Sequence, residues 1–577
     1  MCTDGVQMNL AAQPVLLREP AVGLQLIDYL VMLVYVGGVL ATGFYFSRGD
    51  EEQDEYFVGG RKLPWFAVGL SIVATMLSTV TYLATPGEVI QHGLALSIGW
   101  LAMPVAFVIV NFLWVPFFMR LGVTSIYEYL EQRFGLVARL TAVALFVLIL
   151  RLFWMATIVL TGSRAVAQIT HESMGRVFGL EITQEFWLLI VLCSVGLFAT
   201  FYTMQGGIKA VVWTDVAQFV ALFGGVVLTL FFVWWKTGTG PVDWWETTTG
   251  DRGVGHGFPP LFSWDITTRN TILFTVLSTM FWYGCTFIAD QVAVQRYLST
   301  PSVKAALKGN VVNFVGDFVV MVLLTLCGMA LLSYYLQPGF YFGDPQLPAV
   351  SDRVFPRFIE YGLPIGISGL VVAALFAVAM SSLDSGINSV SAVLTIDVFE
   401  RLRILERLNW ESTQEGRLKL PRRITFVVGV TATALALLML LIPESYNIIG
   451  ITLRTFNCAL GPLAAMFVVG MFVCRVGQEA IVIATWLGLI FAVCLAWWVE
   501  LKWATGLTGH VYLATAQKEV AGPSPFLITP LSSTFTFLMA IVLSFRYPNS
   551  EPQTGELLWR AVVSREEPSR EQHAAGN

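Results

Sequence analysis

Residues 366–397, GISGLVVAALFAVAMSSLDSGINSVSAVLTID, decide the fold class of this chain. The first half is apolar enough for a membrane helix, and the second half keeps the helical repeat but fills it with hydroxyls and one acid. Polar oxygens at bilayer depth are costly unless they face protein, water or an ion. Small residues also let membrane helices pack closely, but this many oxygen donors beside a carboxylate favour a cation site. The donors on one helix face are Ser381, Ser385, Asn388 and Ser389, with Asp384 one turn after Ser381.

The composition of the whole chain is that of a polytopic helical membrane protein. Hydrophobic residues make up 56% of the 577 residues and charged residues 13%, and the mean hydropathy is +0.70. A soluble domain of this length would need more charge on its surface. The seven Cys form no CxxC pair and the five His are scattered, so neither residue type predicts a disulfide or a metal centre. No basic tract indicates a nucleic-acid partner.

Apolar windows predict an all-α fold with about 13 transmembrane helices. Residues 1–24 form a polar leader without the basic region and cleavage site of a signal peptide, so we expect 25–47 to be a retained extra helix. Two C-terminal helices are expected within 477–546, before a charged tail at 547–577. The predicted spans are 25–47, 63–93, 95–119, 136–168, 184–204, 208–235, 267–298, 304–336, 362–399, 421–442, 445–475, 477–500 and 524–546.

The ten central spans divide into two sets of five, residues 63–235 and 267–475. Because five is an odd number, the second set crosses the membrane in the opposite direction. Inverted repeats of this kind place the binding site at mid-membrane, where the first helix of each set is interrupted. The first candidate interruption is Ser-Thr-Val-Thr at 78–81, followed by Pro86 and Gly87. It would leave backbone carbonyls free for a cation, although a simple proline kink would show the same pattern.

The distribution of Lys and Arg predicts the orientation. With the N-terminus outside, the inner loops hold most of the 34 basic residues, which is the positive-inside bias. We therefore expect an integral protein of the plasma or inner membrane, with an extracytoplasmic leader and a cytoplasmic tail.

Three stretches together resemble the sodium:solute symporter family. They are EYFVGGRKLPWFAVGLSIVATMLSTVTYLATPGEV (55–89), GGIKAVVWTDVAQ (206–218) and AVAMSSLDSGINSVSAVLTIDVF (377–399). A fourth, ADQVAVQRYLST (289–300), is similar to the cytoplasmic end of that family's sixth core helix. The resemblance covers roughly residues 25–546. It implies a LeuT-like core of five plus five helices with flanking helices, and symport of a small monocarboxylate-like or sugar-like solute with Na⁺ by alternating access, without enzymatic activity.

The resemblance implies a first sodium site made of three backbone carbonyls and two hydroxyls. The carbonyl positions correspond to Ala74, Leu77 and Val378, and the hydroxyl positions to Ser381 and Ser382. Val378 lies one turn before the two serines, so its carbonyl points along the helix towards them. That spacing supports the assignment independently of the resemblance.

A second sodium site, present in some members of the family, corresponds here to Asp215 of the TDVAQ stretch with Ser381 and Ser385. Asp384 stands where those members have a third serine. The extra carboxylate could strengthen the site or carry a proton. The alternative for Asp215 is a structural ion pair, for which Lys209 is the candidate partner.

The substrate positions of sugar-transporting relatives correspond to Thr81, Asp290 and a position near Leu453 or Arg454. Arg151 lies about one turn from where sialic-acid-transporting relatives hold the substrate carboxylate. A guanidinium binds a carboxylate bidentately, so Arg151 indicates an anionic solute. An internal acid such as Asp317 could equally pair with it.

Two other functions on the same membrane scaffold stay open, a solute sensor and a passive channel. Residues 547–577 are too few for a catalytic output domain, and no GxSxG or GxGD pattern indicates an intramembrane hydrolase. Uphill solute uptake that follows an imposed sodium gradient would distinguish a symporter from a channel.

Overall fold

The computed structural model describes residues 23–46, 53–179, 182–250, 259–265, 268, 271–337, 351–404, 414–442, 448–498, 500–501, 523–549 and 552–565. Within these ranges the chain is helical, and its β-structure is limited to one isolated bridge. The all-α fold is therefore as predicted. Residues 1–22 of the expected leader and 566–577 of the expected tail lie outside the described residues.

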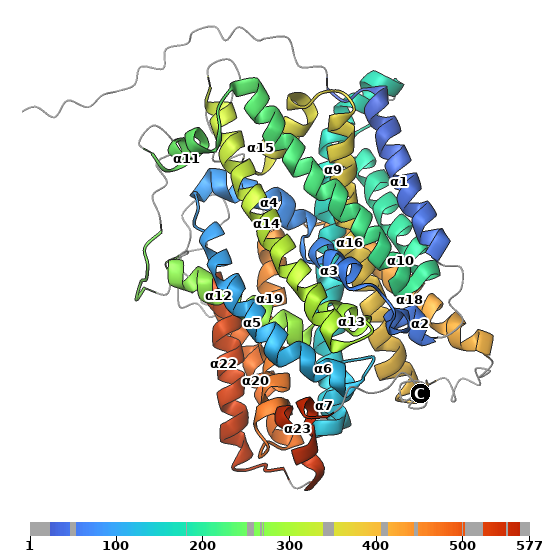
Figure 1. The fold of residues 1–577 in the computed structure, drawn as a ribbon, viewed down its shortest axis with the longest axis vertical. Coiled ribbons are helices and arrows are strands. Elements are labelled where there is room, and N and C mark those ends of the chain that lie inside the picture. The colour runs from blue at the N-terminus through green and yellow to red at the C-terminus, as the bar shows by residue number, and fades with distance from the viewer. Residues whose placement is uncertain are drawn as a thin grey trace, which may run out of the picture.

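The helices pack as one bundle (Figure 1), in which the two predicted five-helix sets follow one another along the chain with flanking helices. After α1 (Leu26–Phe46), the first set begins with α3 (Trp65–Met76) and α4 (Thr79–His92). Its second member runs from η2 (Ser97–Ala102) through α5 (Met103–Ile109) and η3 (Val110–Trp114) to α6 (Val115–Leu121), and its third runs from α8 (Leu136–Ala144) through η4 (Leu145–Leu152) to α9 (Phe153–Phe178). The two halves of α10 (Gln184–Thr237) are the fourth and fifth members. The second set comprises α12 (Ile272–Ala289) with α13 (Gln291–Leu298), α14 (Val303–Leu336), α16 (Ile367–Val393) with η7 (Leu394–Glu400), α18 (Gln414–Met439) and α19 (Ile448–Phe472), and is followed by α20 (Gln478–Ala496) and α22 (Ile528–Ser544). The short helices include α2 (Gln53–Val58), α7 (Tyr127–Phe134), α11 (Pro241–Thr249), α15 (Ser351–Arg357) and α23 (Trp559–Val563).

The number of membrane spans depends on how α10 is counted. Among the described residues, 11 helices are long and apolar enough to cross a membrane, or up to 12 if the bent pair α3 and α4 is one span. Helix α10 runs for 54 residues, which at 1.5 Å per residue exceeds one crossing. Gly207 interrupts it with φ 52° and ψ −154°, and a Cβ there would lie 2.5 Å from the carbonyl oxygen of Tyr56. The prediction of about 13 spans counted the two halves of α10 separately.

Each five-helix set begins with a broken helix. Helices α3 and α4 meet at an angle of 60°, and between them Leu77 and Ser78 have extended backbones. Ser78 caps α4 by accepting a hydrogen bond from the backbone N of Thr81 at 3.3 Å. The break therefore lies at residues 77–78. The predicted interruption extended too far, because residues 79–81 already form the first turn of α4 and Pro86 lies inside that helix.

The second break lies at Asp290, between α12 and α13. Asp290 has an extended backbone that ends α12. Its side chain then caps α13 by accepting a hydrogen bond from the backbone N of Val292 at 3.0 Å. Two interrupted helices thus stand at equivalent places in the two sets, as expected of an inverted-repeat transporter core.

Helix α16 forms the centre of the bundle. Of its most apolar window, 83% is buried inside the protein, and α16 packs against α1, α3, α9, α10 and α18. Figure 1 shows it surrounded by these neighbours. The face of small hydroxyl residues predicted from the sequence therefore points at other helices and not at lipid.

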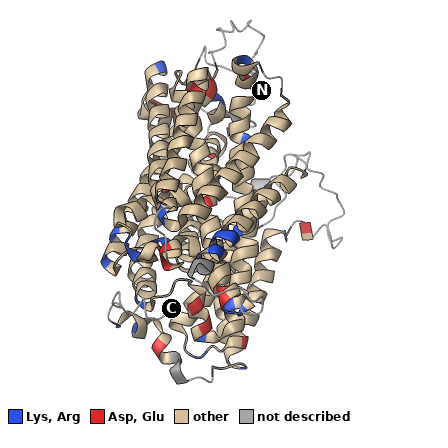
Figure 2. Ribbon diagram, turned by 90° about the vertical axis from the view of Figure 1, so that its right-hand side faces the viewer, with Lys and Arg blue, Asp and Glu red and all other residues tan. Residues whose placement is uncertain are grey.

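Charged residues are unevenly distributed along the long axis of the molecule. Figure 2 shows that Lys and Arg gather mainly in the lower half of the molecule. Such an asymmetry is what the positive-inside argument uses. The placement of the N-terminus outside and the C-terminus in the cytoplasm stays a prediction.

A buried carboxylate of the extra helix α1 caps the central helix α16. Asp28 Oδ1 accepts hydrogen bonds from the backbone N of Gly366 at 2.7 Å and of Gly369 at 2.8 Å, at the start of α16. Asp28 is buried, whereas most of α1 is exposed at the surface of the isolated chain. One side chain from α1 therefore satisfies the first free N–H groups of the central helix.

We expect Asp28→Ala to lower the free energy of unfolding by about 1 kcal/mol, because removing a helix cap leaves backbone N–H groups unsatisfied. The thermal unfolding midpoint in detergent would measure the loss. Asp28→Asn, which keeps an acceptor oxygen, is the matched control and should lose less. An unchanged midpoint in Asp28→Ala would show that the cap does not stabilise α16.

Candidate functional site

The serines of α16 meet the end of α3 at the first helix break. Ser381 Oγ lies 3.0 Å from the carbonyl oxygens of both Ala74 and Val378, and its single proton can be donated to either. Ser382 Oγ donates to the carbonyl oxygen of Thr75 at 3.1 Å. All five residues are buried. Carbonyl and hydroxyl oxygens from two helices thus converge on one small region.

The break in α3 explains why these carbonyls are available. The last carbonyls of a helix have no partner within it. Here Leu77 N closes the final turn by donating to Val73 O at 3.0 Å, which leaves the carbonyls after Val73 to other donors. Hydroxyl groups rotate freely and also accept, so the same serines can offer lone pairs to a cation. The structure therefore brings together Ala74, Val378, Ser381 and Ser382 of the predicted first site, with Leu77 at the adjoining break.

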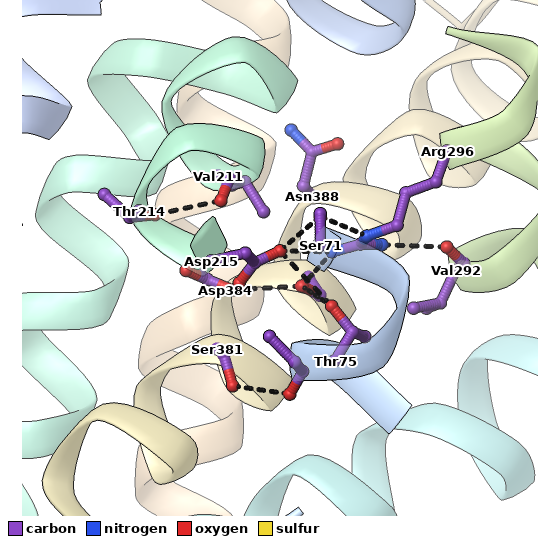
Figure 3. A network of polar contacts seen from close by, with 12 residues as sticks. Ser71, Thr75, Val211, Thr214, Asp215, Val292, Arg296, Ser381, Asp384 and Asn388 are labelled. Atoms are coloured by element: carbon purple, nitrogen blue, oxygen red, sulfur yellow. Dashed lines mark hydrogen bonds and ion pairs between the residues drawn. The ribbon is translucent and has the colours of Figure 1, made fainter. Parts of the chain in front are cut away.

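A second polar cluster surrounds Asp215 (Figure 3). Its Oδ2 accepts hydrogen bonds from Ser71 Oγ at 2.6 Å and Thr75 Oγ1 at 3.3 Å, both on α3. Arg296 of α13 forms an ion pair with the same oxygen, with Nη2 at 3.2 Å. Both charged side chains are fully buried. Three helices thus contribute to one carboxylate.

Ser385 joins this cluster to Asp384. Ser385 Oγ donates to Asp384 Oδ1 at 3.0 Å and hydrogen bonds to Thr75 Oγ1 at 3.0 Å. It also accepts a hydrogen bond from Arg296. The hydroxyl of Tyr202, on α10, donates to Asp384 Oδ2. The cluster holds two carboxylates and one guanidinium, so with all three ionised it carries one net negative charge that a cation would balance.

The partner of Asp215 differs from the one suggested by the sequence. Lys209 forms an ion pair with Glu55 of α2 at 3.5 Å and is partly exposed. Asp215 lies deeper, where Arg296 pairs with it. The proposed pairing of Asp215 with Lys209 is therefore wrong.

The sequence reading did not single out Arg296, Ser71 or Tyr202. The sequence did indicate that Arg296 has a partner, because a charged residue within the predicted span 267–298 must be paired. Ser71 and Thr75 are four residues apart and so share one face of α3. Which helix that face meets depends on tertiary packing.

Arg151, in η4, forms a buried ion pair with Asp290 at the second helix break. Arg151 Nε donates to Asp290 Oδ1 at 3.1 Å, and Nη2 contacts Oδ2. The guanidinium carbon lies 5.8 Å from the ring centroid of Phe456, and this ring packs against Trp154 with centroids 5.1 Å apart. Two of the predicted substrate residues therefore meet beside an aromatic wall. The suggested pairing of Arg151 with Asp317 is wrong, because Asp317 accepts a hydrogen bond from Tyr283 instead.

The other two predicted substrate residues lie elsewhere. Thr81 is in the first turn of α4, with its hydroxyl 3.3 Å from Ser78 Oγ. Arg454 forms a partly exposed ion pair with Glu500 at 3.1 Å and lies over the ring of Trp497. The structure thus does not place Arg454 in the group around Arg151.

Comparison with known proteins settles the family. A model of the sodium:solute symporter family matches residues 56–488. The chain belongs to the sodium:solute symporter family. It is therefore a sodium-coupled symporter and an integral membrane protein, and Na⁺ is the co-transported ion, as the sequence predicted.

Individual relatives of this symporter carry different solutes. The sodium/sialic acid symporter SiaT of Proteus mirabilis is 30% identical over 471 residues, covering 80% of this chain and 88% of that protein. The human sodium/iodide cotransporter is 30% identical over 493 residues, covering 82% and 68%. A solved sodium-coupled sialic acid symporter, in a substrate-bound outward-open state, aligns with a TM-score of 0.73 at 26% identity over 91% of this chain and 99% of that one.

Proposed function

We propose that this symporter imports a small organic acid, of the sugar-acid kind, together with sodium ions by alternating access. The observation that carries the proposal is Arg151, a guanidinium buried beside the break between α12 and α13. A permanently charged residue at such depth is retained at a cost. A carboxylate is the group that a guanidinium recognises best.

A solute carboxylate that binds Arg151 would have to share the guanidinium with Asp290 or replace it. Its carboxylate already receives Nε and Nη2 of Arg151, while a guanidinium has five N–H donors in all. A solute carboxylate would bind the remaining donors or displace Asp290 from the pair. The rings of Trp154 and Phe456 beside the pair offer an apolar wall for the body of the solute.

The relatives support an anionic solute. Their names include sialic acid, monocarboxylate and iodide transporters, whose solutes are anions, and a sodium/glucose cotransporter from Vibrio parahaemolyticus, whose solute is neutral. Arg151 favours the anionic group. Among these anions, a sugar acid joins the carboxylate that suits Arg151 to hydroxyl groups that suit buried polar side chains.

Uptake of radiolabelled sialic acid into proteoliposomes tests the proposal, with lactate and glucose as the alternative solutes. We expect sialic acid to accumulate above its outside concentration when an inward sodium gradient is imposed. Replacing sodium with potassium should abolish the accumulation. Sodium-driven uptake of glucose without uptake of either acid would overturn the proposed solute class and leave sodium coupling intact.

We propose Ala74, Leu77, Val378, Ser381 and Ser382 as the ligands of one sodium ion, and Asp215, Ser385 and Asp384 as the candidates for a second. The free energy released by sodium entry explains why a second ion would help. A charge crossing about 100 mV releases about 2.3 kcal/mol, and a tenfold sodium gradient adds about 1.4 kcal/mol. One sodium ion moving with a monoanion carries no net charge and gains only the concentration term. Uptake of an acid therefore benefits from a second sodium ion.

Removing both hydroxyls from the first site should weaken sodium binding. In Ser381→Ala/Ser382→Ala, we expect the sodium concentration for half-maximal uptake to rise at least about tenfold, or about 1.4 kcal/mol, because two of five oxygen ligands are lost. Ser391→Ala on the same helix is the control, since Ser391 donates to the carbonyl oxygen of Pro421. Unchanged sodium dependence in the folded double variant would end the assignment.

A further inference from the structure

Asp317 is a buried acid that neither the sodium sites nor Arg151 uses. It lies in the middle of α14 and is 1% exposed. Its Oδ2 accepts a hydrogen bond from the hydroxyl of Tyr283, on α12. Its Oδ1 has no hydrogen-bond partner among the described residues. A phenol is thus the single polar group seen to hold this carboxyl.

Aromatic and aliphatic side chains lie around Asp317, together with the buried amide of Asn313 one turn earlier on α14. The ring of Phe314 packs against Tyr283 and Phe287, with centroid distances of 5.6 Å and 5.5 Å. On the other side, α3 approaches so closely that a Cβ at Gly316 would lie 3.1 Å from a methyl carbon of Val73. An ionised carboxylate in such surroundings costs several kcal/mol unless a cation accompanies it.

Within the described part of the chain, no charged side chain interacts with Asp317. Helices α3, α5 and η2, which pack against α14, contain no charged residue. On the other elements that pack against α14, and on α14 itself, most charged groups interact with groups other than Asp317. These contacts are Asp215 with Arg296, Glu88 with His92, Lys209 with Glu55, Arg120 with the carbonyl oxygen of Pro116, Asp243 with Gly240 N, and Lys308 over Trp65. The remaining ones, Glu185, Lys236 and Lys304, lie at helix ends, and Glu246 lies on the short helix α11.

We propose that Asp317 is a proton-binding site. A proton on Oδ1 neutralises the carboxyl, and Oδ2 remains as the acceptor for Tyr283. A neutral carboxyl group explains why aromatic and aliphatic side chains pack around Asp317 and why no described cationic side chain interacts with it. It also explains why the Tyr283 hydroxyl donates to it. The ligand is a proton, and the reaction is its binding to a carboxylate, without any change in covalent bonds between heavy atoms.

The proton site is connected to the half of the broken helix that carries Asp290. Tyr283 lies on α12, seven residues before the helix break at Asp290. Movement of α12 against α14 would separate the phenol from the carboxyl and admit water, which would let the proton leave. This last step rests on the alternating access proposed above, whereas proton binding itself does not.

Infrared spectroscopy of the full chain in lipid vesicles tests the assignment, because protonated carboxyl groups have a C=O band distinct from that of carboxylates. We expect Asp317→Asn to remove the intensity of one protonated carboxyl at mildly acidic pH. Asp28→Asn is the matched control and should leave this band unchanged, since the buried Asp28 carboxylate accepts hydrogen bonds from the backbone N of Gln25, Gly366 and Gly369. The readout needs no transported solute, so it is independent of the proposed function.

Tyr283→Phe provides the second measurement. Loss of the phenol hydrogen bond should move the Asp317 carboxyl band to higher frequency without removing it. The proposal is overturned if Asp317→Asn loses carboxylate intensity in place of the protonated band. If Asp317→Asn does not fold, an unshifted band in Tyr283→Phe overturns it.

Discussion

Arg151→Gln is expected to destabilise the protein by about 3–5 kcal/mol, because Asp290 is then left as an unpaired buried charge. In the structure Asp290 is fully buried and Arg151 nearly so. The thermal unfolding midpoint and the expression level would record the loss. Arg454→Gln is the control for removing an arginine from an ion pair, since its partly exposed pair with Glu500 should be worth at most about 1 kcal/mol.

The double variant Arg151→Gln/Asp290→Asn distinguishes a substrate role from a structural one. Two neutral amides can hydrogen bond to each other, so most of the lost stability should return. If Arg151 binds the solute carboxylate, affinity for the acid should stay low in this stable double variant. Recovery of both stability and affinity would show that the pair is structural, and the proposed recognition of an anion would be wrong.

Asp215→Asn is expected to change the ion stoichiometry as well as the stability. Arg296 would keep Ser385 as a partner but lose its carboxylate, which should cost about 3–5 kcal/mol. The cluster would also lose the negative charge that attracts a second sodium ion. We therefore expect fewer charges to move per solute molecule, measured as the ratio of current to solute flux in proteoliposomes.

Asp384→Asn separates these two effects. It removes the same negative charge from the cluster but leaves the ion pair of Asp215 with Arg296 in place. Stability should fall less than in Asp215→Asn, because one of Tyr202 and Ser385 can still donate to the amide oxygen while the other hydroxyl accepts from the amide N–H. The ratio of current to flux should fall in both variants. An unchanged ratio in both would show that this cluster binds no second sodium ion.

The sequence predicted those features of the candidate site that depend on a single helix. The hydroxyl face of α16, the break near Ser78 and the one-turn spacing from Val378 to Ser381 all follow from local chemistry, and the structure brings Ala74 to that face. Resemblance to one family added the partners on α3. These features depend on periodicity and on helix termini, which short stretches of sequence determine.

Ion pairs between side chains of different helices could not be predicted from local sequence patterns. Arg151 was recognised as needing an acid, yet Asp290 and Asp317 both met that requirement. The choice depends on the break that turns Asp290 towards η4 and on the side chain of Tyr283, which holds Asp317. Lys209 was only the candidate partner in the alternative reading of Asp215, whereas the observed partner, Arg296 on α13, lies 81 residues away in sequence.

Thr75 lies between the two proposed sodium sites. Its carbonyl oxygen accepts a hydrogen bond from Ser382, while its hydroxyl contacts Asp215 and Ser385. A ligand at either proposed site would therefore restrict Thr75, and thermodynamic linkage requires the effect of each ion on the affinity of the other to be equal. For two sodium ions at these sites, we expect cooperative binding that depends on one residue at the end of a broken helix.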